Sequence, residues 1–115
     1  MNASPANLDP ALLDRARGCA VGAAIGDALG MPLEARSPRS LNHLLREMAD
    51  GRLPAGSFTD DTEMALALAE SLLAHRPLDP ADLGRRFVAW ADTGPDDIGV
   101  HTYRVLARLR RGESW

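Results

Sequence analysis

Strong helix start and stop signals divide this sequence at short intervals. Asp9 and Asp79 each precede a proline, an arrangement that caps a helix and fits its first turn. Gly30 and Gly94 each lie just before a further proline, which is typical of a helix end. No stretch alternates apolar and polar residues for long enough to predict a strand. The sequence therefore predicts an all-α fold.

Five helices are expected between these signals, and composition agrees with them. Hydrophobic residues make up 45 % of the chain but aromatic residues only 4 %, which suits closely packed helices better than a β-sandwich. The expected ranges are residues 10–29, 41–48, 60–75, 80–91 and 99–110. The side chains expected to face the core from the last three are Met64, Leu68, Leu72, Leu83, Phe87, Trp90, Tyr103, Leu106 and Leu109.

Length and charge limit the class of protein. A chain of 115 residues predicts one helical domain over residues 10–115, after a flexible N-terminus at residues 1–9. The net charge of -3 argues against a nucleic-acid-binding protein. Residues 1–9 lack the pattern of a secretory signal, and the longest apolar stretch is too short to span a bilayer. With Cys19 as the lone cysteine, we expect a cytoplasmic protein without a membrane partner.

Four glycines in the first expected helix are spaced four residues apart, so they share one face: Gly18, Gly22, Gly26 and Gly30. Each costs about 1 kcal/mol relative to alanine inside a helix. Close packing against another helix would offset that cost, and so would a ligand lying against the end of the stripe. The sequence leaves both interpretations open.

The most informative stretch is the acidic start of the third expected helix, at Thr59, Asp60, Asp61 and Glu63. Acidic residues in a first turn stabilise the helix dipole by only about 0.3–1 kcal/mol each. Adjacent carboxylates also repel one another, and a hard cation bound by oxygen ligands would remove that repulsion. Simple helix capping and metal binding are both open interpretations here.

Three further positions carry weaker signals. Asp97 precedes the fifth expected helix and can serve as its cap, whereas Gly99 in that first turn suggests a close approach to a ligand, such as an anion at a helix N-terminus. Glu34 follows the break after the first helix. A carboxylate there is either simply solvated or a mobile catalytic acid or base on a loop.

Three segments, taken in order, resemble the N-terminal part of the ADP-ribosylglycohydrolase family. They are residues 22–34 (GAAIGDALGMPLE), residues 58–69 (FTDDTEMALALA), and residues 97–99 (DIG) followed by Thr102. The resemblance covers residues 17–112. It implies a multi-helical orthogonal bundle that removes ADP-ribose from a modified protein or a small conjugate, with nucleic acid expected only as a modified substrate.

The resemblance also implies roles for single residues. Thr59, Asp60 and Asp61 match the run with which family members bind two Mg²⁺ or Mn²⁺ ions. Glu34 and Asp97 match positions with catalytic parts: Glu34 contacts the region of the scissile bond or helps to close the site, and Asp97 lies near the ribose. For Gly99 and Thr102, which belong to the same segment, we expect contacts with substrate.

One departure from the family pattern is serious. The family's second metal-binding segment, Asp-x-Asp followed by Thr or Ser, belongs to a much longer chain and is missing here. We therefore expect a truncated product, a fragment, or half of a split protein completed by a C-terminal chain, inactive in isolation. The alternative is a non-catalytic helical module that binds ADP-ribose or a protein partner.

Overall fold

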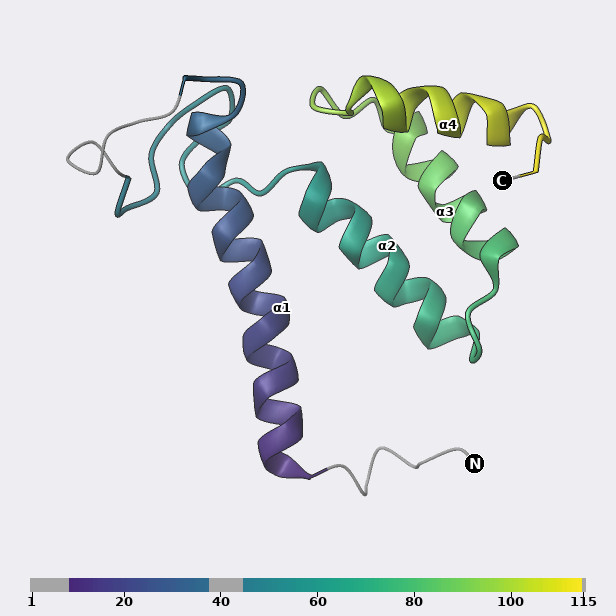
Figure 1. Ribbon diagram of the computed structural model, residues 1–115, viewed down its shortest axis with the longest axis horizontal. Helices are drawn as coiled ribbons and strands as arrows, with labels where there is room; N and C mark the ends of the chain where they lie inside the picture. Colours follow the sequence, from purple (N-terminus) through teal and green to yellow (C-terminus); the bar gives the residue numbers. More distant parts are fainter. Residues whose placement is uncertain (1–8, 38–44, 115) are drawn as a thin grey trace. The chain divides into compact units, whose positions relative to one another are not determined.

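A computed structural model of the chain describes residues 9–37 and 45–114, and these residues form helices and loops without any strand. The elements are α1 (Pro10–Gly30), the short 3-10 helix η2 (Met31–Leu33), α2 (Asp60–Ala74), α3 (Pro80–Asp92) and α4 (Val100–Arg110) (Figure 1). The predicted all-α class is confirmed. None of the described helices is both long enough and apolar enough to cross a membrane.

The chain divides into two compact units, residues 1–58 and 59–115. In the first unit, α1 runs directly into η2, and the loop that follows returns to the same end of α1 (Figure 1). Met31 and Pro32 of η2 are buried. The loop reaches them through Gly51, so η2 and this loop pack together.

The second unit is built on a helical hairpin. α3 packs against α2, and α4 packs against α3; Figure 1 shows α3 returning beside α2 and α4 crossing the far end of α3. Trp90 of α3 donates a hydrogen bond from Nε1 to the carboxylate of Glu63 in α2. The buried apolar centre of this unit includes Leu106 of α4, which is only 3 % exposed.

The helix signals in the sequence act as expected. Asp9 accepts a hydrogen bond from the amide of Ala11, and Asp79 accepts one from the amide of Ala81. Each carboxylate thereby satisfies an amide that has no partner within its own helix, and the proline occupies the first turn. The predicted starts and ends of these helices, of α2 and of α4 agree with the structure to within one residue.

The helix predicted over residues 41–48 is wrong in the part that can be judged. Residues 45–48 are not helical, while residues 41–44 lie outside the described residues. A helix of only eight residues depends on tertiary packing for its stability. Residues 46–48 are exposed and lack that packing.

Two of the predicted core side chains are also misplaced. Leu72 is 41 % exposed and Tyr103 is 57 % exposed. Each of these two side chains lies one residue, about 100° of helix rotation, from an inward position. Ser71 takes the buried position in α2, and Thr102 with Leu106 faces inward in α4.

A polar network explains why α2 buries a serine there. The hydroxyl of Ser71, which is fully buried, donates a 2.8 Å hydrogen bond to Oδ2 of Asp82 in α3. Nε of Arg86 donates to the same oxygen at 2.7 Å, and the Arg86 guanidinium also bonds Glu70 of α2 at 3.0 Å. These bonds from Arg86 and Ser71 lower the pKa of Asp82 to about 2. The network ties α2 to α3.

The glycine stripe of α1 has no packing partner in its own unit. Among the described residues, nothing lies within 4 Å of a Cβ placed at Gly18, Gly22, Gly26 or Gly30. Within this unit, the helix-packing interpretation therefore has no contact to support it.

Replacing Asp82 with Asn should destabilise the second unit at neutral pH, because the ionised carboxylate accepts both hydrogen bonds. Since folding lowers this pKa, the stabilisation is fully present above the ordinary value of about pH 4 and is lost as the pH falls toward the folded value. Urea unfolding from pH 7 to pH 2 should therefore show the difference between wild type and Asp82→Asn shrinking below about pH 4. Asp14→Asn, at an exposed position in α1, is the control. A difference that is constant with pH would contradict the assignment.

Candidate active site

The start of α2 is completed by a side chain from a distant part of the chain. Thr59 is the N-terminal cap residue of α2, but its side chain makes no capping hydrogen bond. Instead, the amide of Asp60 donates a 3.1 Å hydrogen bond to Oδ2 of Asp97, which precedes α4. This contact brings together two of the segments that the sequence singled out, although they lie 37 residues apart.

Negative charge accumulates at this point. The Asp60 carboxylate accepts hydrogen bonds from the Thr59 hydroxyl and the Asp61 amide, both of which favour its ionised form. Partial burial nevertheless raises the pKa of Asp60, and the charges of Asp97 and Asp61 raise it further. Helix capping explains the hydrogen bond that the Asp60 amide donates to Asp97. It does not explain why two more carboxylates share the site.

The described residues do not form a complete metal site by themselves. Across residues 9–37 and 45–114, no group of three or more His, Cys, Asp or Glu side chains has the arrangement of a metal site. Mg²⁺ requires near-octahedral oxygen coordination and often completes it with water and substrate oxygens. The carboxylates of Asp60 and Asp61, with the buried Thr59 hydroxyl, have the donor chemistry that Mg²⁺ or Mn²⁺ prefers.

Gly99 and Thr102 lie on the first turn of α4 in the same unit. Gly99 is the cap residue of α4, and a Cβ at that position would meet Thr102 Oγ1 at 3.8 Å, an ordinary contact. Crowding among the described residues therefore does not require a glycine. Thr102 lines a mostly apolar hollow of about 460 Å³ together with Met64, Phe87 and other side chains.

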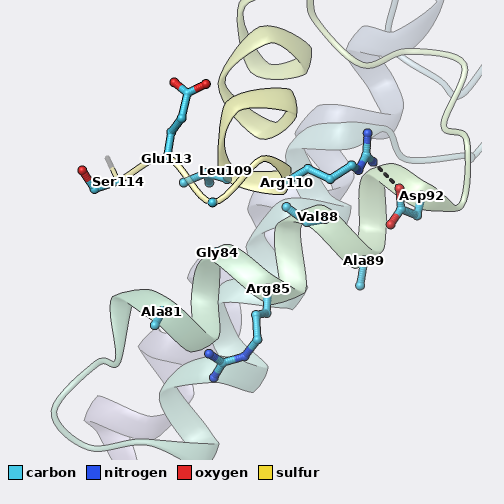
Figure 2. Close-up of a pocket in the computed structure, with 11 residues that line it drawn as sticks. Ala81, Gly84, Arg85, Val88, Ala89, Asp92, Leu109, Arg110, Glu113 and Ser114 are labelled. Atoms are coloured by element: carbon cyan, nitrogen blue, oxygen red, sulfur yellow. Dashed lines mark hydrogen bonds and ion pairs between the residues drawn. The ribbon is translucent and has the colours of Figure 1, made fainter.

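A larger hollow of about 660 Å³ lies between α3 and α4 (Figure 2). Val88 and Leu109 contribute apolar surface, and Arg110 forms an ion pair with Asp92 at one end. None of the residues that the sequence predicted for the site lines this hollow.

Glu34 belongs to the first unit, where it follows η2 directly. The Arg52 guanidinium donates to Glu34 Oε2 from Nη2 at 2.7 Å and from Nε at 3.3 Å. Ala35 then turns the chain with a positive φ of 56°. Sequence reasoning missed Arg52, because nothing in its immediate neighbours distinguishes it from an ordinary loop arginine.

The family model described as ADP-ribosylglycohydrolase matches residues 8–115, nearly the whole chain. The chain belongs to the ADP-ribosylglycohydrolase family.

Several curated relatives are similar along most of this chain. The ADP-ribosyl-[dinitrogen reductase] glycohydrolase of Rhodospirillum rubrum is 42 % identical over 105 residues, covering 86 % of this chain and 36 % of the relative. The ADP-ribosylarginine hydrolase Tri1 of Serratia proteamaculans is 41 % identical over 113 residues, covering 90 % and 31 %. The human ADP-ribosylhydrolase ARH3 is 37 % identical over 108 residues, covering 84 % and 30 %. The chain thus spans about a third of the length of these relatives.

Asp60→Asn should stabilise the chain at pH 7 when no metal is added. Ionisation of this carboxylate opposes folding because its pKa is raised, so stability falls as the pH rises through that pKa. A neutral amide relieves the repulsion, for which about 0.5 kcal/mol, or a rise of about 2–4 °C in Tm, is the expected scale. Thermal unfolding followed by circular dichroism measures it, with Asp96→Asn at the neighbouring exposed position as the control. A lower Tm for Asp60→Asn would contradict the electrostatic interpretation.

Proposed function

We propose that this chain provides the first part of a metal-dependent hydrolase site, which cleaves the glycosidic bond between ADP-ribose and a modified target. The observation that carries the proposal is the meeting of Asp97 with the acidic start of α2. Family membership supports it, and so do the relatives named above, which are hydrolases of ADP-ribosyl groups.

In this proposal Thr59, Asp60 and Asp61 hold Mg²⁺ or Mn²⁺. Their oxygens match the ligand preference of these ions. A dication would favour the ionised form of Asp60, whose pKa is raised by burial and by the charges of Asp97 and Asp61. When bound, such ions orient ribose hydroxyls and stabilise negative charge that develops during the reaction. The ligands still missing would come from the Asp-x-Asp segment of the family, which this chain lacks.

From the family resemblance, Asp97 in the second unit and Glu34 in the first unit are each proposed as catalytic carboxyl groups. Cleaving a glycosidic bond creates oxocarbenium character at the ribose carbon, and a pair of carboxyl groups is the usual way to protonate one side and activate the other. The bond from the Asp60 amide holds Oδ2 of Asp97 in place. The bonds from Arg52 hold Oε2 of Glu34.

In this proposal, the C-terminal part of the family domain is also the partner that completes the helical fold. Large apolar side chains in the second unit are strongly exposed, including Leu73 at 73 %, Val100 at 67 % and Tyr103 at 57 %. Exposed apolar surface of this kind commonly marks a contact with another segment. We propose that a C-terminal segment, in the same or another chain, covers these helices.

Metal binding can be tested on the chain itself. Titration with Mn²⁺, followed by the electron paramagnetic resonance signal of the free ion, should show binding at the start of α2. Asp60→Asn and Asp61→Asn should each weaken it by about tenfold or more, because each removes a charged oxygen ligand. Asp96→Asn should bind as wild type does. Equal affinities in all four proteins would count against the site.

Hydrolysis can be tested in a chimaera. Residues 8–115 would replace the matching third of the Rhodospirillum rubrum relative, which provides the rest of the domain. The chimaera should release ADP-ribose from ADP-ribosylated dinitrogen reductase only when Mg²⁺ or Mn²⁺ is present, and Asp97→Asn should reduce kcat by about 10²–10⁴-fold.

The same experiment separates the alternative function. Asp96→Asn in the chimaera is the matched control and should retain full activity. A folded chimaera that binds ADP-ribose without turnover would contradict the hydrolase proposal and indicate a non-catalytic binding module.

A further inference from the structure

The ion pair between Arg52 and Glu34 is held by a tightly packed loop, which distinguishes it from an incidental surface contact. Exposed ion pairs usually contribute little to stability, and here the two side chains are 35 % and 42 % exposed. Stability alone therefore gives little reason for the pair. The way in which the loop positions Arg52 indicates a role other than stabilising the fold.

The residue before Arg52 is fixed against η2. A Cβ on Gly51 would lie 2.7 Å from the backbone Cα of Pro32 and 2.9 Å from the side-chain sulfur of Met31, both closer than real Cβ contacts. Met31 is itself only 2 % exposed, so it has little room to move. Only glycine allows the loop to approach this closely.

The loop around Gly51 is also braced by its own hydrogen bonds. The Gly51 amide donates to the Leu53 carbonyl at 2.9 Å, and the Ala55 amide donates to Asp50 Oδ1 at 2.8 Å. A preset backbone reduces the conformational entropy that Arg52 loses when it pairs with Glu34.

The geometry of the pair leaves part of Glu34 available. Both donated bonds end on Oε2, and no described residue donates to Oε1. The guanidinium thus fixes the carboxylate and keeps its charge balanced, while Oε1 can still meet a substrate proton or hydroxyl.

We propose that Arg52 is a positioning residue for Glu34, held by the packing of Gly51 on Pro32. This inference rests on the proposed function of Glu34. Arg52 itself touches no reacting atom; it fixes the direction from which Glu34 approaches the substrate.

The contact is tested first without any activity measurement. In the NMR spectrum of the ¹⁵N-labelled chain, the Arg52 Nε–H should give a signal protected from exchange. Arg52→Lys assigns that signal by its absence, and Glu34→Gln should weaken or remove its protection. A signal that is unprotected in the wild type would overturn the proposal.

A kinetic double-mutant cycle in the chimaera tests the role. Arg52→Gln and Gly51→Ala should each lower kcat by about tenfold, the effect of a misplaced catalytic group, with KM changed less than about threefold. In a Glu34→Gln background neither should lower kcat further, because no carboxylate remains to be positioned. Arg36→Gln removes an equal charge from the neighbouring turn and should leave kcat unchanged.

The outcomes separate this inference from the proposed function. The positioning role is wrong, and the proposed function stands, if Glu34→Gln abolishes turnover while Arg52→Gln leaves kcat unchanged. The same conclusion follows if Arg52→Gln lowers kcat equally in the presence and the absence of the Glu34 carboxylate. If Glu34→Gln retains full activity, or the folded chimaera has none, the proposed role of Glu34 fails and the positioning role fails with it.

Discussion

The bond between the Asp60 amide and the Asp97 carboxylate is the contact on which the candidate site depends. It satisfies an amide that the first turn of α2 cannot satisfy itself, since the Thr59 side chain makes no capping bond. The same bond brings a third carboxylate to a place that already holds those of Asp60 and Asp61. Helix capping and charge accumulation are therefore consequences of one arrangement.

Stability and the candidate chemistry involve different parts of the second unit. The hairpin of α2 and α3 is tied together by the buried Ser71 hydroxyl and the ion pairs around Asp82 and Arg86. In that network every acid described has a basic or hydroxyl partner, and the pKa of Asp82 is lowered. At the start of α2, burial and the charges of Asp97 and Asp61 outweigh the hydrogen bonds to Asp60, and the pKa of Asp60 is raised. A carboxyl group whose surroundings raise its pKa in this way is typical of a binding or catalytic site.

Local signals in the sequence were sufficient for α1, α2, α3 and α4, but not for the inward faces of α2 and α4. They also predicted a helix over residues 41–48, whose described part, residues 45–48, is not helical. Asp9 and Asp79 act on amides two residues away, so the starts of α1 and α3 could be predicted from neighbours alone. The inward positions of α2 and α4 depend on partners in other helices, and Leu72 and Tyr103 were misplaced by one residue as a result.

In the candidate site, too, some features could be predicted from the sequence and others could not. Thr59, Asp60, Asp61 and Asp97 could be selected from residue type and family resemblance, although the bond that joins Asp60 to Asp97 could not. Arg52 could not be selected at all, because its contact with Glu34 depends on how closely Gly51 packs on η2. That packing is a property of the folded loop.

The central claim is that the carboxylates at the start of α2 are arranged for a hard dication. Anomalous diffraction from crystals soaked in Mn²⁺ tests it directly. The account predicts a manganese peak with oxygens of Asp60 and Asp61 at about 2.0–2.3 Å, near the distance typical of small divalent ions. A fully ordered α2 in saturating Mn²⁺ without a peak at these side chains would contradict it.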